Sequence, residues 1–123
     1  MRRLLALLLL AGTVAQAQEG FPLDGTWRGQ RTAEGAAPVT IVMILQWDGK
    51  RVTGIINPGP KQLAVADAAL ITQGWRVKVA ARTAAGEDVV FEGSLAELGS
   101  YHRSITGTWQ EGGHSYQVRM VRE

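Results

Sequence analysis

The sequence predicts an all-β fold, a single up-and-down antiparallel β-barrel of about eight short strands. Apolar and polar residues alternate with a period of two along most of the chain after residue 23. Turn-forming dipeptides, namely Asp48-Gly49, Gln73-Gly74 and Gly112-Gly113, separate the extended segments. Only residues 96–100 read as a single helical turn. Many short strands joined by tight turns favour a barrel over a mixed fold.

The first 17 residues are expected to be a cleaved secretory signal peptide. Arg2 and Arg3 precede an apolar run from Leu4 to Leu10, and Ala15-Gln16-Ala17 has the small-x-small pattern that signal peptidase requires. The apolar stretch is shorter than the roughly 20 residues that span a bilayer. We therefore expect residues 18–123 to form the barrel, with no membrane span, in a periplasmic or secreted protein.

Charge and composition argue against a nucleic-acid partner. The chain has 13 Lys and Arg and 11 Asp and Glu, so losing Arg2 and Arg3 with the signal leaves 11 of each sign. A neutral chain without a basic run lacks the electrostatic footprint of nucleic-acid binding. The remaining 106 of 123 residues suit one domain. Without cysteine, its stability must come from apolar burial.

The first three strands are expected over residues 24–31, 39–47 and 50–57. Trp27 lies on the inner face of the first strand by alternation. Asp48-Gly49 predicts a two-residue turn between the other two. That turn would pair Leu45 with Val52, Met43 with Gly54, and Ile41 with Ile56.

The hairpin of residues 75–82 and 88–95 is constrained on both of its faces. Its predicted inner pairs are Ala81 with Val89, Val79 with Phe91, and Val77 with Gly93, and its outer pairs are Arg82 with Asp88 and Lys78 with Glu92. Opposite charges directly across two strands stabilise the pairing. The turn at Gln73-Gly74 joins this hairpin to the preceding strand, placing Leu70 opposite Val77 and Ala68 opposite Val79.

The last hairpin joins residues 101–111 to residues 114–122 at Gly112-Gly113. Its predicted pairs are Trp109 with Tyr116, Gly107 with Val118, and Ile105 with Met120.

The predicted interior contains aromatic side chains opposite very small ones. All four tryptophans are placed inward by alternation (Trp27, Trp47, Trp75 and Trp109), as are Gly54, Gly93 and Gly107. Inward glycine lets a strand coil sharply, as a small closed barrel requires. A barrel of about eight strands is either filled by its own side chains or holds one small ligand, and both alternatives stay open.

Loop lengths predict where a pocket would open. The connections 32–38, 58–61, 83–87 and 111–113 fall at one end of an up-and-down barrel, and the tight turns at 48–49 and 73–74 fall at the other. Ala64, Ala66, Ala68 and Ala81 are expected to leave space inside the looser end. The predicted ligand-binding residues there are Met43, Phe91, Trp109 and Tyr116.

No catalytic, metal-binding or cofactor-binding residues are predicted. His102 and His114 lie at opposite ends of the last hairpin and are expected on the surface, so they would not share a metal. The chain has no cysteine and no Gly-x-Ser-x-Gly nucleophile motif. Asp88 and Glu92 are expected to face cations rather than a shared cleft. We therefore expect a protein that is not an enzyme.

Gly25-Thr26-Trp27 on the first strand resembles the Gly-x-Trp motif that opens members of the calycin group, namely lipocalins, avidin-like proteins and small bacterial secreted relatives. The resemblance implies that Arg122, on the last strand, lies across Trp27 as a cation–π contact at the closed end. Lipocalins are longer and usually carry disulfides. The polar residues through which avidins hold biotin do not map onto this chain, so biotin binding is not implied.

Two functions follow as alternatives. The first is a secreted, non-catalytic, lipocalin-like barrel that binds a small hydrophobic or aromatic ligand inside. The second is a protein-interaction module, such as a periplasmic protease inhibitor or an envelope accessory protein, acting through its surface. Small inhibitors of secreted metalloproteases share this barrel size, but they carry a cysteine pair and an N-terminal trunk that this chain does not match.

Overall fold

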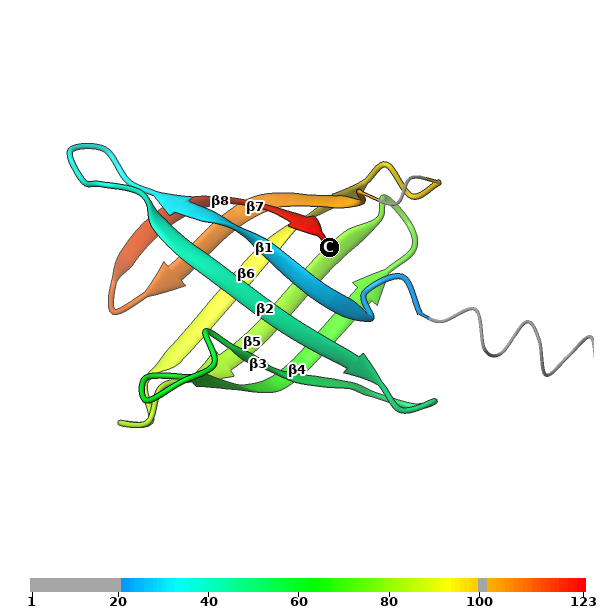
Figure 1. Ribbon diagram of the computed structural model, residues 1–123, viewed down its shortest axis with the longest axis horizontal. Coiled ribbons are helices and arrows are strands. Elements are labelled where there is room, and N and C mark those ends of the chain that lie inside the picture. The colour runs from blue at the N-terminus through cyan, green and yellow to red at the C-terminus, as the bar shows by residue number, and fades with distance from the viewer. Residues whose placement is uncertain (1–20, 100–101) are drawn as a thin grey trace, which may run out of the picture.

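The period-two pattern becomes eight strands, which the computed structural model describes within residues 21–99 and 102–123. They are β1 (Gly25–Thr32), β2 (Val39–Trp47), β3 (Val52–Ile56), β4 (Leu63–Ile71), β5 (Arg76–Arg82), β6 (Asp88–Ala96), β7 (Ser104–Glu111) and β8 (His114–Arg122). Each strand pairs antiparallel with the next, and β1 pairs with β8 to close the barrel (Figure 1). The predicted fold class is confirmed. The predicted signal peptide and the expected strand start at residue 101 lie outside the described residues.

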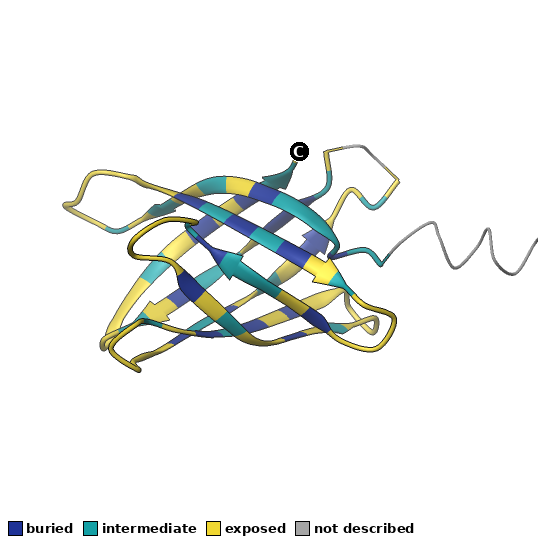
Figure 2. Ribbon diagram, turned by 60° about the horizontal axis from the view of Figure 1, so that its bottom comes forward, coloured by how far each residue is buried: buried dark blue, intermediate teal, exposed yellow. Residues whose placement is uncertain are grey.

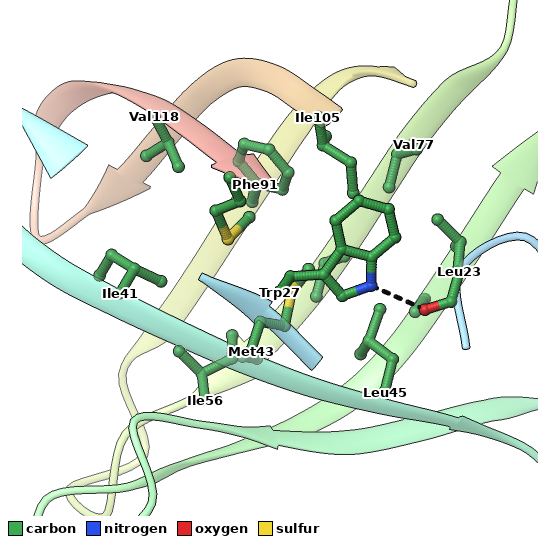
Figure 3. Packing of buried hydrophobic residues seen from close by; sticks show 14 of the residues in the cluster. Leu23, Trp27, Ile41, Met43, Leu45, Ile56, Val77, Phe91, Ile105 and Val118 are labelled. Carbon is green, nitrogen blue, oxygen red and sulfur yellow. Dashed lines mark hydrogen bonds between the residues drawn. The ribbon is translucent and has the colours of Figure 1, made fainter. Parts of the chain in front are cut away.

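Alternate residues of each strand turn into one shared apolar interior. Buried and exposed positions therefore succeed one another along the strands (Figure 2). Among the described residues, 19 apolar side chains are buried and form one cluster, of which Trp27, Trp109 and Phe91 are the largest. Trp27 lies among core side chains from several strands, and its Nε1 donates a hydrogen bond to the Leu23 carbonyl at 2.9 Å (Figure 3).

The registers predicted for three of the hairpins are confirmed. In β5–β6, Ala81 lies opposite Val89 and Val79 opposite Phe91. The outer charges also meet, with Arg82 3.3 Å from Asp88 and Lys78 3.8 Å from Glu92. The pairs predicted for β4–β5 and β7–β8 are present as well. In β5–β6, the apolar pairs inside and the charge pairs outside specify the same register.

The predicted register of β2–β3 is wrong by two residues. Leu45 lies opposite Gly54 and Met43 opposite Ile56, so the turn spans residues 48–51. The cause is the Asp48 side chain, whose Oδ1 accepts hydrogen bonds from the backbone N–H groups of Lys50 at 2.8 Å and Arg51 at 2.7 Å. A shift of two leaves every side chain on its predicted face.

A bulge in β4 overturns the predicted placement of two alanines. The pairing with β5 shifts between Val65 and Asp67, and the extra residue exchanges the two faces of the strand. Ala64 and Ala66 are therefore exposed, whereas Ala68 is buried as expected. Ala64 and Ala66 therefore do not contribute the interior space that was predicted for them.

One of the four tryptophans, Trp75, departs from the predicted inward orientation. Trp27 and Trp109 are buried as expected. Trp47 also lies on the inner row of β2, where it is half-buried, packs against the core and stacks on Phe21, with 4.5 Å between ring centroids. Trp75 is 38% exposed, because it sits in the β4–β5 turn with a φ of 50° instead of in an extended conformation. Alternation along β5 therefore does not reach it.

The inward glycines mark places where neighbouring strands approach closely. A Cβ atom at Gly54 would lie 2.0 Å from the Ile44 carbonyl oxygen, and one at Gly107 would lie 2.0 Å from that of Glu92. No L side chain fits such a gap without displacing backbone.

Across residues 21–99 and 102–123, the structure contains no helix with the length and apolarity needed to cross a membrane.

Candidate functional site

The two ends of the barrel differ in what closes them. The β1–β2, β3–β4, β5–β6 and β7–β8 connections gather at one end, called the loop end here (Figure 1). The β2–β3 and β4–β5 turns, the β6–β7 connection and the C-terminus lie at the opposite end. This distribution was predicted from loop positions, and the loop end is where the site was expected.

Three of the four predicted ligand-binding residues form one ladder across adjacent strands. Phe91 on β6 lies directly opposite Trp109 on β7, which lies directly opposite Tyr116 on β8. Phe91 and Trp109 are buried, and Tyr116 is half-buried. We call Phe91, Trp109 and Tyr116 the aromatic ladder. The fourth residue, Met43, is buried on β2 opposite Trp27, and it shares only the common core with the ladder.

A charged pair lies over the outer rung of this ladder. The Arg31 guanidinium lies 4.3 Å from the centroid of the Tyr116 ring, a cation–π contact. Its Nη1 is 3.3 Å from Oε1 of Glu111. The same Glu111 oxygen accepts a hydrogen bond from Trp109 Nε1 at 3.1 Å. We call Arg31, Trp109, Glu111 and Tyr116 the mouth cluster.

The two charges of the mouth cluster are largely shielded from water. The side chain of Arg31 is 22% exposed and that of Glu111 is 31% exposed. Their attraction is therefore stronger than that of a pair on the outer surface. Nε of Arg31 is buried and has no hydrogen-bond partner among the described residues. A buried N–H without an acceptor costs about 1–3 kcal/mol, so this arginine keeps an unused donor at an energetic cost.

Arg31 and Glu111 were not among the predicted site residues. Arg31 lies four residues after Trp27 on β1, an even spacing, so the alternation that places Trp27 inward also places Arg31 inward. Likewise, Glu111 follows Trp109 by two residues on β7. The signal was therefore in the pattern, at the ends of two strands.

Among the described residues, the cation–π contact of Arg122 with Trp27 that the family resemblance implied is not present. Arg122 lies directly opposite Trp27 across β8 and β1, as expected. However, its guanidinium packs against Gly25, where an added Cβ would lie 2.6 Å from Arg122 Nε. In the part of the chain that the structure describes, Arg31 and Tyr116 at the loop end form a cation–π contact instead.

The outer surface carries a groove that the sequence did not predict. It has a volume of about 610 Å³ and crosses β5, β6 and β7 on the outside of the barrel. Its polar lining includes Lys78, Glu92, Thr108 and Gln110, and Ile71 lines it as well.

Among the described residues, no three His, Cys, Asp or Glu side chains gather as metal ligands would.

Fold and mouth cluster together define a closed, eight-stranded antiparallel barrel with an apolar core and a charged pair over aromatic rings at its loop end. The topology is consistent with a calycin-like fold. No protein-family model matches the chain, and no curated protein matches its sequence.

Proposed function

We propose that the protein is a secreted, non-catalytic, calycin-like binding protein that takes a small hydrophobic or aromatic ligand at the loop end of its barrel. The observation that carries the proposal is the aromatic ladder, which runs from the buried core at Phe91 to the half-buried ring of Tyr116. Aromatic rings offer a large contact area and a preferred stacking geometry to such a ligand.

Apolar surface at the loop end supports this position. Val39, at the start of β2, shares the inner row of Ile41 and Met43 and lies directly opposite Arg31, yet it is 44% exposed. The nearby loops consist mainly of exposed small residues, including Ala36, Ala84 and Ala85. The deeper interior is filled by the barrel's own side chains. A ligand would therefore sit on Tyr116 and Val39, with Met43, Phe91 and Trp109 beneath it.

The test is saturable binding of the uncharged fluorescent probe N-phenyl-1-naphthylamine to the mature protein. We expect Tyr116→Ala to weaken binding about tenfold, since an aromatic contact contributes about 0.5–1.5 kcal/mol beyond its buried area. The matched control is Trp75→Ala, which removes an exposed ring at the opposite end and should leave binding unchanged. Absence of saturable binding to the wild-type protein, or an equal loss in both variants, would overturn the proposal.

A protein-interaction module, such as a periplasmic protease inhibitor or an envelope accessory protein, is the second candidate. It is favoured by two exposed apolar side chains, Ile71, which lines the outer groove at the end of β4, and Trp75, which lies in the following turn. Contiguous exposed apolar surface marks contact sites for other proteins, and these two side chains are the starting point for such a surface. If Trp75→Ala abolishes capture of a periplasmic partner that Tyr116→Ala still binds, this second function is supported over the first.

A further inference from the structure

The inner face of β1 ends in a charged side chain, that of Arg31, where an apolar side chain would extend the core. Arg31 follows Trp27 and Gly29 on the inner face of β1, and its guanidinium rests on the Tyr116 ring. A charge that is mostly removed from water needs partners for its donors. Glu111 satisfies only part of this need.

The pairing of Arg31 with Glu111 is incomplete. A guanidinium has five N–H donors in a planar fork and binds a carboxylate best through two parallel hydrogen bonds. Here one contact of 3.3 Å joins Nη1 to Glu111 Oε1, while the buried Nε has no partner among the described residues. Stacking on Tyr116 restricts the guanidinium plane. Arg31 is thus held in place with part of its fork unused.

Glu111 can release Arg31 and still keep a hydrogen-bond partner. Its Oε1 also accepts the hydrogen bond from Trp109 Nε1, and its side chain is the more exposed of the pair. If an acidic group from outside took over Arg31, Glu111 would keep Trp109 as a donor and would gain water. The exposed acids of the neighbouring loops, Glu34 and Glu87, are hydrated and screened by salt, so they oppose such a group only weakly.

From these contacts we infer that the ligand is an amphipathic anion, whose carboxylate or sulfonate binds the Arg31 fork while its apolar body lies on Tyr116 and Val39. Glu111 is the internal competitor that the anion displaces. The inference rests on the proposed ligand-binding function and adds to it the chemical class of the ligand. Arg31 then determines specificity by contributing more to charged than to neutral ligands of the same shape.

The experiment compares two fluorescent probes with nearly the same aromatic body. One is 1-anilinonaphthalene-8-sulfonate, which carries an anionic group, and the other is the uncharged N-phenyl-1-naphthylamine. We expect the wild-type protein to bind the sulfonate about tenfold more tightly, since hydrogen bonds to charged groups are the strong ones. Arg31→Gln should abolish this preference, and Glu111→Gln should increase sulfonate affinity severalfold, by more than it changes the affinity for the neutral probe.

Matched controls are available at the same end of the barrel. Arg82→Gln and Asp88→Asn alter an exposed ion pair on the outer face and should leave the preference unchanged. Far-UV circular dichroism of each variant checks that the barrel is folded. If both probes bind equally to the wild-type protein and to Arg31→Gln, the pair only closes the barrel end and the inference is overturned, while the proposed function stands. If neither probe binds, the proposed function itself fails.

Discussion

At the scale of single residues, the closest approach of β6 to β7 depends on a pair of glycines. Gly93 lies directly opposite Gly107, and a Cβ on Gly107 would lie 2.0 Å from the Glu92 carbonyl oxygen and 2.5 Å from Gly93 Cα. Both atoms belong to backbone, so they cannot move aside without distorting the ladder. We expect Gly107→Ala to lower the free energy of unfolding by about 3 kcal/mol, measured by urea denaturation.

Gly99 provides the control for this substitution. Apart from its chain neighbours, no atom of the described residues lies within 4 Å of a Cβ built there, and its φ lies outside the left-handed region. Gly99→Ala should therefore change the free energy of unfolding by no more than about 0.5 kcal/mol. Equal effects of the two substitutions would show that the strands can separate at Gly107 at little cost.

The site residues differ in how far the sequence could predict them. Alternation was enough to place Phe91, Trp109 and Tyr116 inward, and the local register of β7–β8 paired Trp109 with Tyr116. The pairing of Phe91 with Trp109 across β6 and β7 was not predicted. The contact of Arg31 with Tyr116 and Glu111 depends on the pairing of β1 with β8, which joins the two ends of the chain. Arg31 stands at the end of its strand, and only barrel closure gives it a ring and a carboxylate as neighbours.

At the scale of elements, the turn between β2 and β3 is held by one carboxylate. Backbone N–H groups of Arg51 and Lys50 donate to Asp48, and these hydrogen bonds lower its pKa below the ordinary value of 3.8. A lowered carboxylate pKa stabilises the fold above the ordinary pKa, and this contribution is lost as the pH falls through the folded value. We expect Asp48→Ala to lower the urea midpoint at pH 7, with a smaller difference from the wild type below pH 3.8.

Asp48→Asn separates the charge from the hydrogen bonds. Its amide oxygen still accepts from the backbone but does not titrate, so its difference from the wild-type midpoint should be smaller at pH 7 than that of the alanine variant. If the midpoints of wild type and Asp48→Ala stay equally far apart from pH 7 to pH 3, the carboxylate does not hold the turn.

The elements also show where a sequence pattern is ambiguous. The charges of β5 and β6 allow only one register, and that prediction was correct. In β2–β3 a slip of two residues keeps every side chain on its face, so only the geometry around Asp48 decides the register. In β4, alanines occupy both faces, so the two faces do not differ in polarity. The bulge after Val65 therefore could not be predicted from the sequence pattern. Trp75 was misplaced for a related reason, since its turn backbone breaks the alternation.

At the scale of the whole molecule, the barrel is completed by contacts between its two ends. Arg28 on β1 forms an ion pair with Glu123, 95 residues away in the sequence, and the backbone N–H of Glu123 donates to the Thr26 carbonyl at 2.8 Å. Such pairing carries a large loop-closure entropy, so closure is expected to limit the folding rate. The same contacts bring Glu123 next to the start of β1.

Because β1 pairs with β8 and Glu123 lies beside Thr26, the barrel should not depend on where the chain is opened, provided that the opening falls in a loop. A permutant that joins Glu123 to Phe21 by a short glycine-serine linker and begins at Gly35, in an exposed loop, keeps all eight strand pairings. We expect one cooperative urea transition, with the free energy of unfolding within about 1 kcal/mol of wild type. Opening between Phe91 and Glu92 interrupts β6, which pairs with both β5 and β7, and should prevent folding. If the loop permutant also fails to fold, or the β6 permutant folds as well as wild type, the closed barrel is not what holds the molecule together.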